Sequence, residues 1–345
     1  MGGVDGGVPG EAALEELLSR PTAVVVEAMR ALTGDLLILG AGGKLGPSLA
    51  RLARRASQEA GGEHRVLAVA RFSDSSLRSL LECDGVDTLE CDLFDHEKLA
   101  ALPDASNVIY LVGQKFGTSG DEARTWAVNA FLPGLVAERF PEARIVAFST
   151  GNVYPLSPVG GSGPAETDPV GPIGEYAESA LGRERVFEFF SRHHATPMAL
   201  LRLNYAIEPR YGVLRDIADR VWVRQPVDLA MGMVNVIWQR DANAVAIRAL
   251  AQTAVPPLVL NVTGRPAHSV RWIAQEFGRR WGREPEFSGA EGTTALLSDS
   301  ARMEELFGKP EVGIERMIEY VAQWVERGGR SLGKPTHFEQ REGRF

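Results

Sequence analysis

Cysteine is scarce in this chain. Only Cys83 and Cys91 occur among 345 residues, they form no CxxC pair, and no histidine cluster lies near them in the sequence. Two such residues offer neither a disulfide framework nor the ligand spacing of a zinc site, and their scarcity fits a reducing compartment. We therefore expect a cytoplasmic protein without a metal site.

Long apolar runs and an excess of positive charge are also missing. No apolar stretch approaches the roughly 20 residues that a membrane-spanning helix needs. The glycine-rich, acidic N-terminus does not have the pattern of a secretory signal. The net charge is −8, and no basic run is interleaved with aromatic residues, which argues against a nucleic-acid surface. With 44% hydrophobic residues the chain can bury an ample core, so we expect a soluble protein with neither a membrane nor a nucleic-acid partner.

What the sequence does contain is an alternation of short apolar runs and helical patterns from residue 35 onward. Such alternation is typical of an α/β fold in which helices wind on both faces of a parallel sheet. Strands are expected at 36–39, 65–70, 87–90, 107–112, 144–148, 198–203 and 258–262, and helices at 122–139, 270–281 and 314–325. Residues 1–10 offer almost nothing to bury and are expected to be disordered.

The stretch 34–51 is the most informative part of the sequence. An apolar run at 36–39, typical of a strand buried on both faces, leads into Gly40, Gly43 and Gly46 and then into a helical pattern. In a dinucleotide site one such glycine makes the turn, one lets the backbone approach a pyrophosphate, and one lets the helix pack on the strand. The helix N-terminus then holds the phosphates. An ordinary strand-to-helix turn is the alternative, but this setting favours a dinucleotide site.

These patterns divide the chain into three parts. Residues 1–33 form an N-terminal extension with one or two short helices over 11–32, and 34–204 form a Rossmann-type dinucleotide-binding domain. Residues 205–345 form a smaller C-terminal substrate-binding lobe together with elements that return to the sheet.

Further motifs follow in order along the chain. They are GxxGxxG at 40–46, Asp92-Leu93, Asn129, Ser149-Thr150 with Val153-Tyr154, Tyr176, Arg202-Leu203-Asn204 and Asp241. In these motifs, over about residues 34–324, the chain resembles the extended short-chain dehydrogenase/reductase superfamily. Its NAD-dependent epimerase/dehydratase family includes nucleotide-sugar epimerases, dehydratases and reductases.

The resemblance implies roles for single residues. Thr150 would bind the substrate oxygen, and Tyr176 would exchange a proton with the substrate while a hydride passes to or from the nicotinamide. Asp92 and Leu93 would contact the adenine, and Asn129 would support the active site through backbone and water contacts. A phenol with a pKa near 10 must be tuned downward to do such work near neutral pH.

At one position the sequence departs from the family. The lysine that the family carries four residues after the tyrosine is Ala180 here. In the family that lysine holds the nicotinamide ribose and lowers the tyrosine pKa by its charge. Three interpretations stay open. Another cation replaces it, with Lys115 as the first candidate and Arg183 as the second; the chemistry needs no activated tyrosine; or the protein binds a dinucleotide without catalysis. A solvated loop charge is the plainer interpretation of Lys115.

The end of the second expected strand bears on the choice of cofactor. A carboxylate there would bond the ribose 2′-hydroxyl and select NAD, but the chain has Arg71 and Ser73, with no carboxylate before Asp74. Arg71 and Ser73 suit a 2′-phosphate. NADP is therefore the expected cofactor and NAD the alternative, while an ordinary surface arginine is the plainer interpretation of Arg71.

The expected function is NAD(P)-dependent oxidoreductase, epimerase or dehydratase chemistry on a carbohydrate-like or nucleotide-sugar alcohol or ketone. A catalytically silent NAD(P)-binding or sensor protein is the alternative, because of Ala180. Members of the superfamily usually pair two helices from each subunit, so the resemblance implies a homodimer. Its apolar surface would come from Phe187, Phe189 and Phe190.

The candidate site residues form three groups, and no metal ligand is expected. The catalytic residues are Thr150, Tyr176 and Lys115. The cofactor-binding residues are Gly40, Gly43, Lys44, Leu45, Gly46, Arg71, Ser73, Asp92, Leu93 and Asn129. The residues expected to bind the small-molecule substrate are Asn152, Asn204 and Arg210. For Arg210 the alternative is a simple salt bridge.

Overall fold

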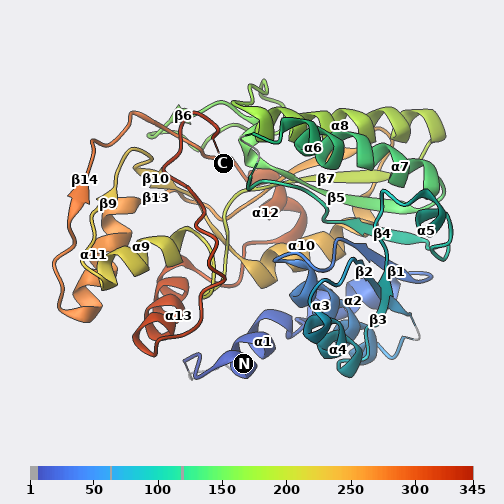
Figure 1. The fold of residues 1–345 in the computed structure, drawn as a ribbon, viewed down its shortest axis with the longest axis horizontal. Helices are drawn as coiled ribbons and strands as arrows, with labels where there is room; N and C mark the ends of the chain where they lie inside the picture. Colours follow the sequence, from blue (N-terminus) through green and yellow to red (C-terminus); the bar gives the residue numbers. More distant parts are fainter. Residues whose placement is uncertain (1–6, 63, 118–119, 345) are drawn as a thin grey trace.

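A parallel sheet of seven strands forms the centre of the structure, a computed structural model that describes residues 7–62, 64–117 and 120–344. The strand order is β12-β7-β5-β4-β1-β2-β3, and every neighbouring pair is parallel (Figure 1). The strands are β1 (Leu36–Leu39), β2 (Val66–Ala70), β3 (Asp87–Glu90), β4 (Asn107–Tyr110), β5 (Arg144–Thr150), β7 (Met198–Leu203) and β12 (Leu258–Val262). This confirms the expected doubly wound α/β fold.

Helices cover both faces of the sheet. One layer contains α2 (Ala23–Ala31), α3 (Gly46–Glu59), α4 (Ser75–Cys83), α10 (Gln239–Ala249) and α12 (Ala301–Phe307); the other contains α5 (His96–Ala100), α6 (Glu122–Trp126), α7 (Leu132–Arg139) and α8 (Glu175–His194). In β1, Leu36 and Ile38 pack into the first layer, and Leu37 and Leu39 pack into the second. This two-sided burial explains why the strand is apolar throughout.

The expected strands agree closely with the observed ones. Four of them have the expected bounds, β2 starts one residue later, β4 ends at Tyr110, and β5 continues to Thr150. The helix expected over 122–139 is instead interrupted by a π-helical turn, Ala127–Phe131, between α6 and α7. Asn129 lies in this π-helical turn and is fully buried. The periodicity of the sequence does not predict such a turn.

A second lobe has its own core, built on three helices and pairs of short strands. The helices are α9 (Val213–Trp222), α11 (Val270–Trp281) and α13 (Ile314–Glu326). The paired strands are β6 (Ser157–Pro158) with β15 (Thr294–Ala295), β8 (Ala206–Ile207) with β11 (Ile237–Trp238), β9 (Val227–Asp228) with β14 (Phe287–Ser288), and β10 (Met233–Val234) with β13 (His268–Ser269). The 3-10 turns Gly151–Val153 and Leu250–Gln252 complete the structure.

Both ends of the described chain pack against this lobe. The helix α1 (Glu11–Ser19) buries Leu14 and Leu18 in its core. Residues 1–6 of the segment expected to be disordered lie outside the described residues. The expectation is wrong for Val8, which is buried because its apolar side chain joins the lobe core. The segment 327–344 leaves α13 and runs back between the lobe and the sheet (Figure 1), burying Phe338.

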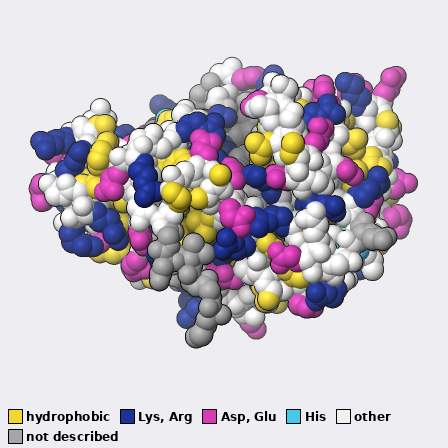
Figure 2. Space-filling model, turned by 90° about the horizontal axis from the view of Figure 1, so that it is seen from below, with side chains coloured by type: hydrophobic (Ala, Val, Ile, Leu, Met, Phe, Trp, Pro, Cys, Tyr) yellow, Lys and Arg dark blue, Asp and Glu magenta, His cyan; other side chains and the backbone are white. Residues whose placement is uncertain are grey.

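The face that carries α1 and α13 has no large surface of one sign. Basic and acidic side chains alternate there, with scattered apolar ones between them (Figure 2). In the described part of the chain, no helix is long and apolar enough to cross a membrane. The described residues contain no group of three or more His, Cys, Asp or Glu side chains able to hold a metal ion.

Candidate functional site

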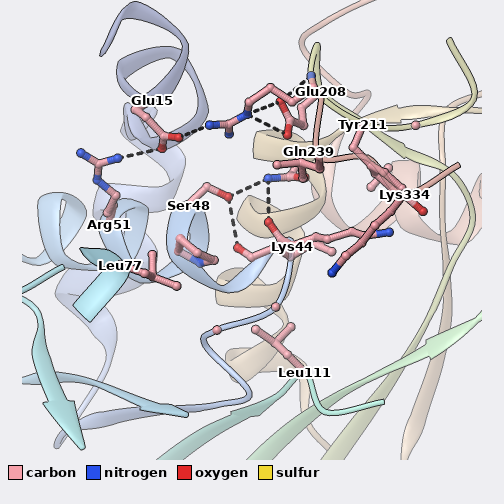
Figure 3. A pocket seen from close by; sticks show the side chains of 18 of the residues that line it. Glu15, Lys44, Ser48, Arg51, Leu77, Leu111, Glu208, Tyr211, Gln239 and Lys334 are labelled. Carbon is pink, nitrogen blue, oxygen red and sulfur yellow. Dashed lines mark hydrogen bonds and ion pairs between the residues drawn. The ribbon is translucent and has the colours of Figure 1, made fainter. Parts of the chain in front are cut away.

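A cavity of about 1290 Å³ lies at the edge of the sheet where the parallel strands end, and the second lobe forms its opposite wall. Residues that follow β1, β4, β5 and β7 line it. In a doubly wound sheet a crevice forms where the strand order reverses; here that point is β1, which lies between β4 and β2. Figure 3 shows part of this wall, with Lys44 and Ser48 on one side and Tyr211 and Lys334 on the other.

The glycine loop has the geometry of a phosphate cradle. Gly40 has a φ of +85°, which favours glycine, and a Cβ on Gly46 would lie 2.3 Å from the carbonyl oxygen of Ala41. The loop can therefore turn sharply and bring α3 close to β1. Gly43 faces the cavity, because an added Cβ would meet only Gly40 O, at 3.3 Å, within 4 Å. This open side at the start of α3 fits a pyrophosphate.

Two side chains of the α10 helix fix this loop. Gln239 Nε2 donates to Ser48 Oγ at 2.9 Å and to the carbonyl oxygen of Lys44 at 3.4 Å, and Asn243 Nδ2 donates to Ser48 Oγ at 3.0 Å. Sequence reasoning missed both residues. The only signal was their position beside Asp241, which was noted as a family marker but given no role.

Thr150 and Tyr176 meet at the floor of the cavity. Asn152 donates two hydrogen bonds to Thr150 Oγ1, from its backbone N–H at 3.2 Å and its side-chain amide at 3.0 Å. A side-chain hydrogen bond joins Thr150 to Tyr176. Burial raises the pKa of Tyr176 above its ordinary value, while this hydrogen bond and the charge of Arg183 act in the opposite direction. The structure thus brings three of the expected residues together: Thr150, Tyr176 and Asn152.

Arg183 is a buried cation held by neutral groups. Its guanidinium donates to the carbonyl oxygen of Phe148 at 2.8 Å, to Asn129 Oδ1 at 2.7 Å and to the carbonyl oxygen of Asn129 at 3.3 Å. Among the described residues it makes no ion pair. Asn129 also bonds the backbone of Gln114 in both directions, at 2.8 and 2.9 Å. Asn129 thus joins α8 to the segment that follows β4 and holds Arg183 beside the tyrosine.

Ala180 leaves no open space at the position of the family lysine. It is fully buried and packs with Val153 and Tyr154 in a small apolar cluster. The segment after β4 instead places Lys115 near the tyrosine, with Nζ 5.9 Å from the centroid of the Tyr176 ring and 3.4 Å from the carbonyl oxygen of Thr336. Burial lowers the pKa of Lys115 to about 8. Lys115 is therefore a partly buried side chain that lines the cavity. It is not a solvated loop charge, which was the alternative interpretation of this residue.

A buried polar network supports the floor from below. Glu184 and Arg202 form an ion pair at 2.7 Å and are both almost completely buried. Ser149 Oγ donates to Glu184 at 2.5 Å, and Arg202 donates to Tyr154 Oη at 2.7 Å, which in turn donates to Asn261 at 2.9 Å. The network ties β5 to α8, β7 and β12, so it fixes the position of Thr150 at the end of β5.

Two of the residues expected to bind substrate, Asn204 and Arg210, line the cavity but already have partners in the protein. Asn204 lines the cavity and its amide donates to Asn235 at 2.8 Å. Arg210 also lines it, but forms ion pairs with Glu208 at 3.0 Å and Glu15 at 2.5 Å, as the salt-bridge alternative predicts.

The residues expected near the adenine are not in the cavity wall. Asp92 and Leu93 follow β3 at the same edge of the sheet; Asp92 is exposed and Leu93 packs in the core. Arg71 and Ser73 are exposed beyond the end of β2. Asp74, which follows them, accepts from the N–H of Ser76 and caps α4.

Sequence reasoning also missed the two terminal segments. Glu15 of α1 bridges Arg51 of α3, at 2.7 Å, and Arg210 of the second lobe (Figure 3). From the other end, Lys334 and Thr336 line the cavity. Glu15 and Arg210 are 195 positions apart, and Thr336 accepts a hydrogen bond from Lys115 across 221 positions, so no local pattern could have indicated these contacts.

Comparisons with known proteins identify the family of the chain and solved structures with a similar fold. The family model for the NAD dependent epimerase/dehydratase family matches residues 36–220, more than half of the chain. The fold resembles a UDP-glucuronic acid 4-epimerase from Bacillus cereus solved with NAD, with a TM-score of 0.71 at 16% identity over 85% of this chain and 99% of that one. It also resembles a UDP-glucose 4-epimerase from Thermotoga maritima solved with UDP-glucose, with a TM-score of 0.69 at 17% identity over 85% and 99%. An epimerase from Methanothermobacter thermautotrophicus gives 0.71 at 16% identity over 89% and 96%. No curated protein sequence matches the chain.

Proposed function

The chain belongs to the NAD-dependent epimerase/dehydratase family, and from this premise we propose that it is an NAD(P)-dependent enzyme that oxidises an alcohol or reduces a ketone of a carbohydrate-like molecule. Reduction, epimerisation and dehydration in this family share that redox step. The observation that carries the proposal is the hydroxyl pair Thr150–Tyr176 on the floor of a cavity whose wall is the glycine loop.

The cavity residues divide the work of such a step between them. NAD(P), held by the amides of Gly43, Lys44 and Leu45 at the start of α3, supplies hydride chemistry when bound. Thr150 binds the substrate oxygen, and Tyr176 takes the proton of the alcohol or returns it to the ketone. The positive charge of Arg183, which has no carboxylate partner among the described residues, stabilises the phenolate form of Tyr176.

NADP is the proposed cofactor. Arg71 is exposed beyond β2 and makes no ion pair among the described residues, so it is available to a 2′-phosphate. Asp74, the first carboxylate after β2, uses its side chain to cap α4. The NAD complexes of the similar structures leave NAD as the alternative.

A catalytically silent dinucleotide-binding protein is the second candidate, and Ala180 is the observation that favours it. The Tyr176→Phe variant separates the two. If the protein is an enzyme, this variant binds NADP(H) as the wild type does by titration calorimetry, but no longer changes NADPH absorbance with a substrate that the wild type turns over. Thr196→Ser, a conservative change outside the cavity, is the matched control. Absence of turnover by the wild type across sugars, sugar acids, sugar phosphates and nucleotide sugars would favour the silent protein.

A further inference from the structure

Lysine is rare in this chain, yet it is concentrated at the cavity. The sequence contains five lysines, and almost all of its other basic residues are arginines. Three of the five, Lys44, Lys115 and Lys334, line the cavity. They come from the glycine loop, from the segment after β4 and from the C-terminal segment, so the fold brings together three charges that are far apart in the sequence.

The side chain of Lys44 leaves the glycine loop and crosses to the second lobe. Its ammonium lies 3.2 Å from the centroid of the Tyr211 ring and 4.5 Å from that of Phe116 (Figure 3). Aromatic faces attract a cation without neutralising its charge. Among the described residues, neither Lys44 nor Lys334 forms an ion pair with a carboxylate.

Both like charges and carboxylates act on these lysines. Burial, followed by the positive charges of Lys115 and Lys334, lowers the pKa of Lys44 to about 7. The carboxylates that face the lysines are Asp216, Glu208 and Glu339.

Two of these carboxylates have partners of their own. Asp216 accepts two hydrogen bonds from Thr336, at 2.6 and 2.7 Å, and Glu208 is paired with Arg210. Lys115 and Lys334 nevertheless repel the positive charge of Lys44 in a partly buried space, and a bound anion would offset that repulsion.

We propose that Lys44, Lys115 and Lys334 form a subsite for a carboxylate or phosphate group of the substrate, so that the substrate is an acidic sugar derivative. This inference rests on the proposed function. Lys115 Nζ lies 5.9 Å from the Tyr176 ring centroid, which places the anion close to the hydroxyl that reacts. The C-terminal segment completes the subsite, because Lys334 and the Thr336 carbonyl that accepts from Lys115 both belong to it.

The cofactor phosphates are not the natural occupants of this subsite. A pyrophosphate at the start of α3 is held by backbone amides, whereas the Lys44 side chain ends at Tyr211 in the other lobe. Arg71, the residue proposed for a 2′-phosphate, lies beyond the end of β2 and does not line the cavity. A substrate anion and the cofactor phosphates are therefore expected to respond to different substitutions.

The test measures anion binding to the full chain by titration calorimetry, with and without NADP. The probes are D-gluconate for a carboxylate, D-glucose 6-phosphate for a phosphate, acetate and inorganic phosphate as bare anions, and D-glucose as the neutral control. Variants are Lys44→Gln and Lys334→Gln, with the exposed Lys309→Gln as the matched control. Thermal melting checks that each variant is folded.

We expect an acid to bind and glucose not to bind, and each cavity substitution to weaken the acid about tenfold. Lys309→Gln should leave the anion affinity within twofold, and Lys334→Gln should leave the NADP affinity within twofold. The anion affinity should fall as the pH rises through about 7 to 8, because Lys44 and Lys115 lose their charges there. The preferred probe identifies the group as carboxylate or phosphate.

Three results would overturn the proposal: no anion binds, the anion affinity is insensitive to both substitutions, or NADP affinity falls in parallel with anion affinity in Lys334→Gln. Failure of the proposed function looks different. In that case NADP does not bind or no substrate turns over, while anion binding and its loss in Lys44→Gln and Lys334→Gln remain measurable.

Discussion

Replacing Lys115 with methionine should lower the fraction of Tyr176 that is deprotonated below about pH 8, where the lysine carries its charge. Methionine retains much of the length of the lysine stem but removes its charge. The ammonium lies 5.9 Å from the Tyr176 ring centroid, and two unit charges at that separation interact by about 3 kcal/mol at an effective dielectric constant of about 20, or about 2 pKa units. Below its own pKa of about 8, Lys115 is charged and favours the phenolate of Tyr176. Above that pH the lysine is neutral, so wild type and variant should converge.

The assay is the pH profile of kcat/KM in the direction of alcohol oxidation. Activity in this direction needs a deprotonated base and rises with pH through the pKa of the free enzyme. Below about pH 8, where Lys115 is charged, Lys115→Met should have up to about a hundredfold lower kcat/KM, and this difference should shrink as the pH rises above 8. NADP affinity should be unchanged. Lys309→Met, in an exposed position, controls for a general effect of losing a lysine.

An unchanged kcat/KM below pH 8 in Lys115→Met would refute the reasoning for Lys115. Arg183 would then be the cation that acts on Tyr176, as its buried position beside the tyrosine allows. In that case Arg183→Gln should move the midpoint upward and Arg183→Lys should restore it, because the conservative variant retains the charge. If neither Lys115→Met nor Arg183→Gln changed the pH profile, the chemistry would not depend on an activated tyrosine.

Four further results are expected. Gly43→Val should abolish NADP binding in calorimetry, because its side chain would occupy the open side of the loop that fits the pyrophosphate. An added Cβ would lie a tight 3.3 Å from Gly40 O, so thermal melting must show that the variant is folded; undiminished binding would make the loop a plain turn. Arg71→Ala should weaken NADP about ten- to a hundredfold and NAD hardly at all, and equal losses would reject the NADP preference. Glu184→Gln leaves Arg202 buried without its carboxylate and should lower the free energy of unfolding by about 3–5 kcal/mol in urea; a loss below about 1 kcal/mol would contradict this. Phe189→Glu, on an exposed side chain, should convert a homodimer to monomers in light scattering, whereas a monomeric wild type would contradict the dimer itself.

The proposed dimer surface also shows where a sequence pattern is ambiguous. Phe187, Phe189 and Phe190 were grouped as apolar surface, but α8 is a helix, so neighbouring positions face different ways. Phe187 is fully buried and packs edge-on against Tyr110. Phe189 is exposed, as is Phe131 on the neighbouring π-helical turn. Phe187 therefore belongs to the core and cannot contribute to an interface.

The sheet and the glycine loop could be predicted because their signals are local. A strand buried on both faces must be apolar at every position, as β1 is, and the three glycines each meet a steric or functional need within a few residues of β1. The support of Thr150 was less accessible. Glu184 and Arg202 are eighteen positions apart on different elements, and only the packing of α8 against β7 makes them a pair.

The positive charge near Tyr176 could be predicted from the sequence only in part. The sequence shows that the family lysine is absent at position 180 and leaves three interpretations open. For a replacement cation it ranks Lys115 before Arg183, but it cannot place either side chain. The structure places both near the tyrosine, from different elements, and fills the space around Ala180 with Val153 and Tyr154. A lysine at position 180 would overpack that cluster. Restoring the family lysine should therefore cost stability, and the chain has positive charge beside Tyr176 without it. The positive charge beside Tyr176 therefore weakens the case that Ala180 makes for a silent protein.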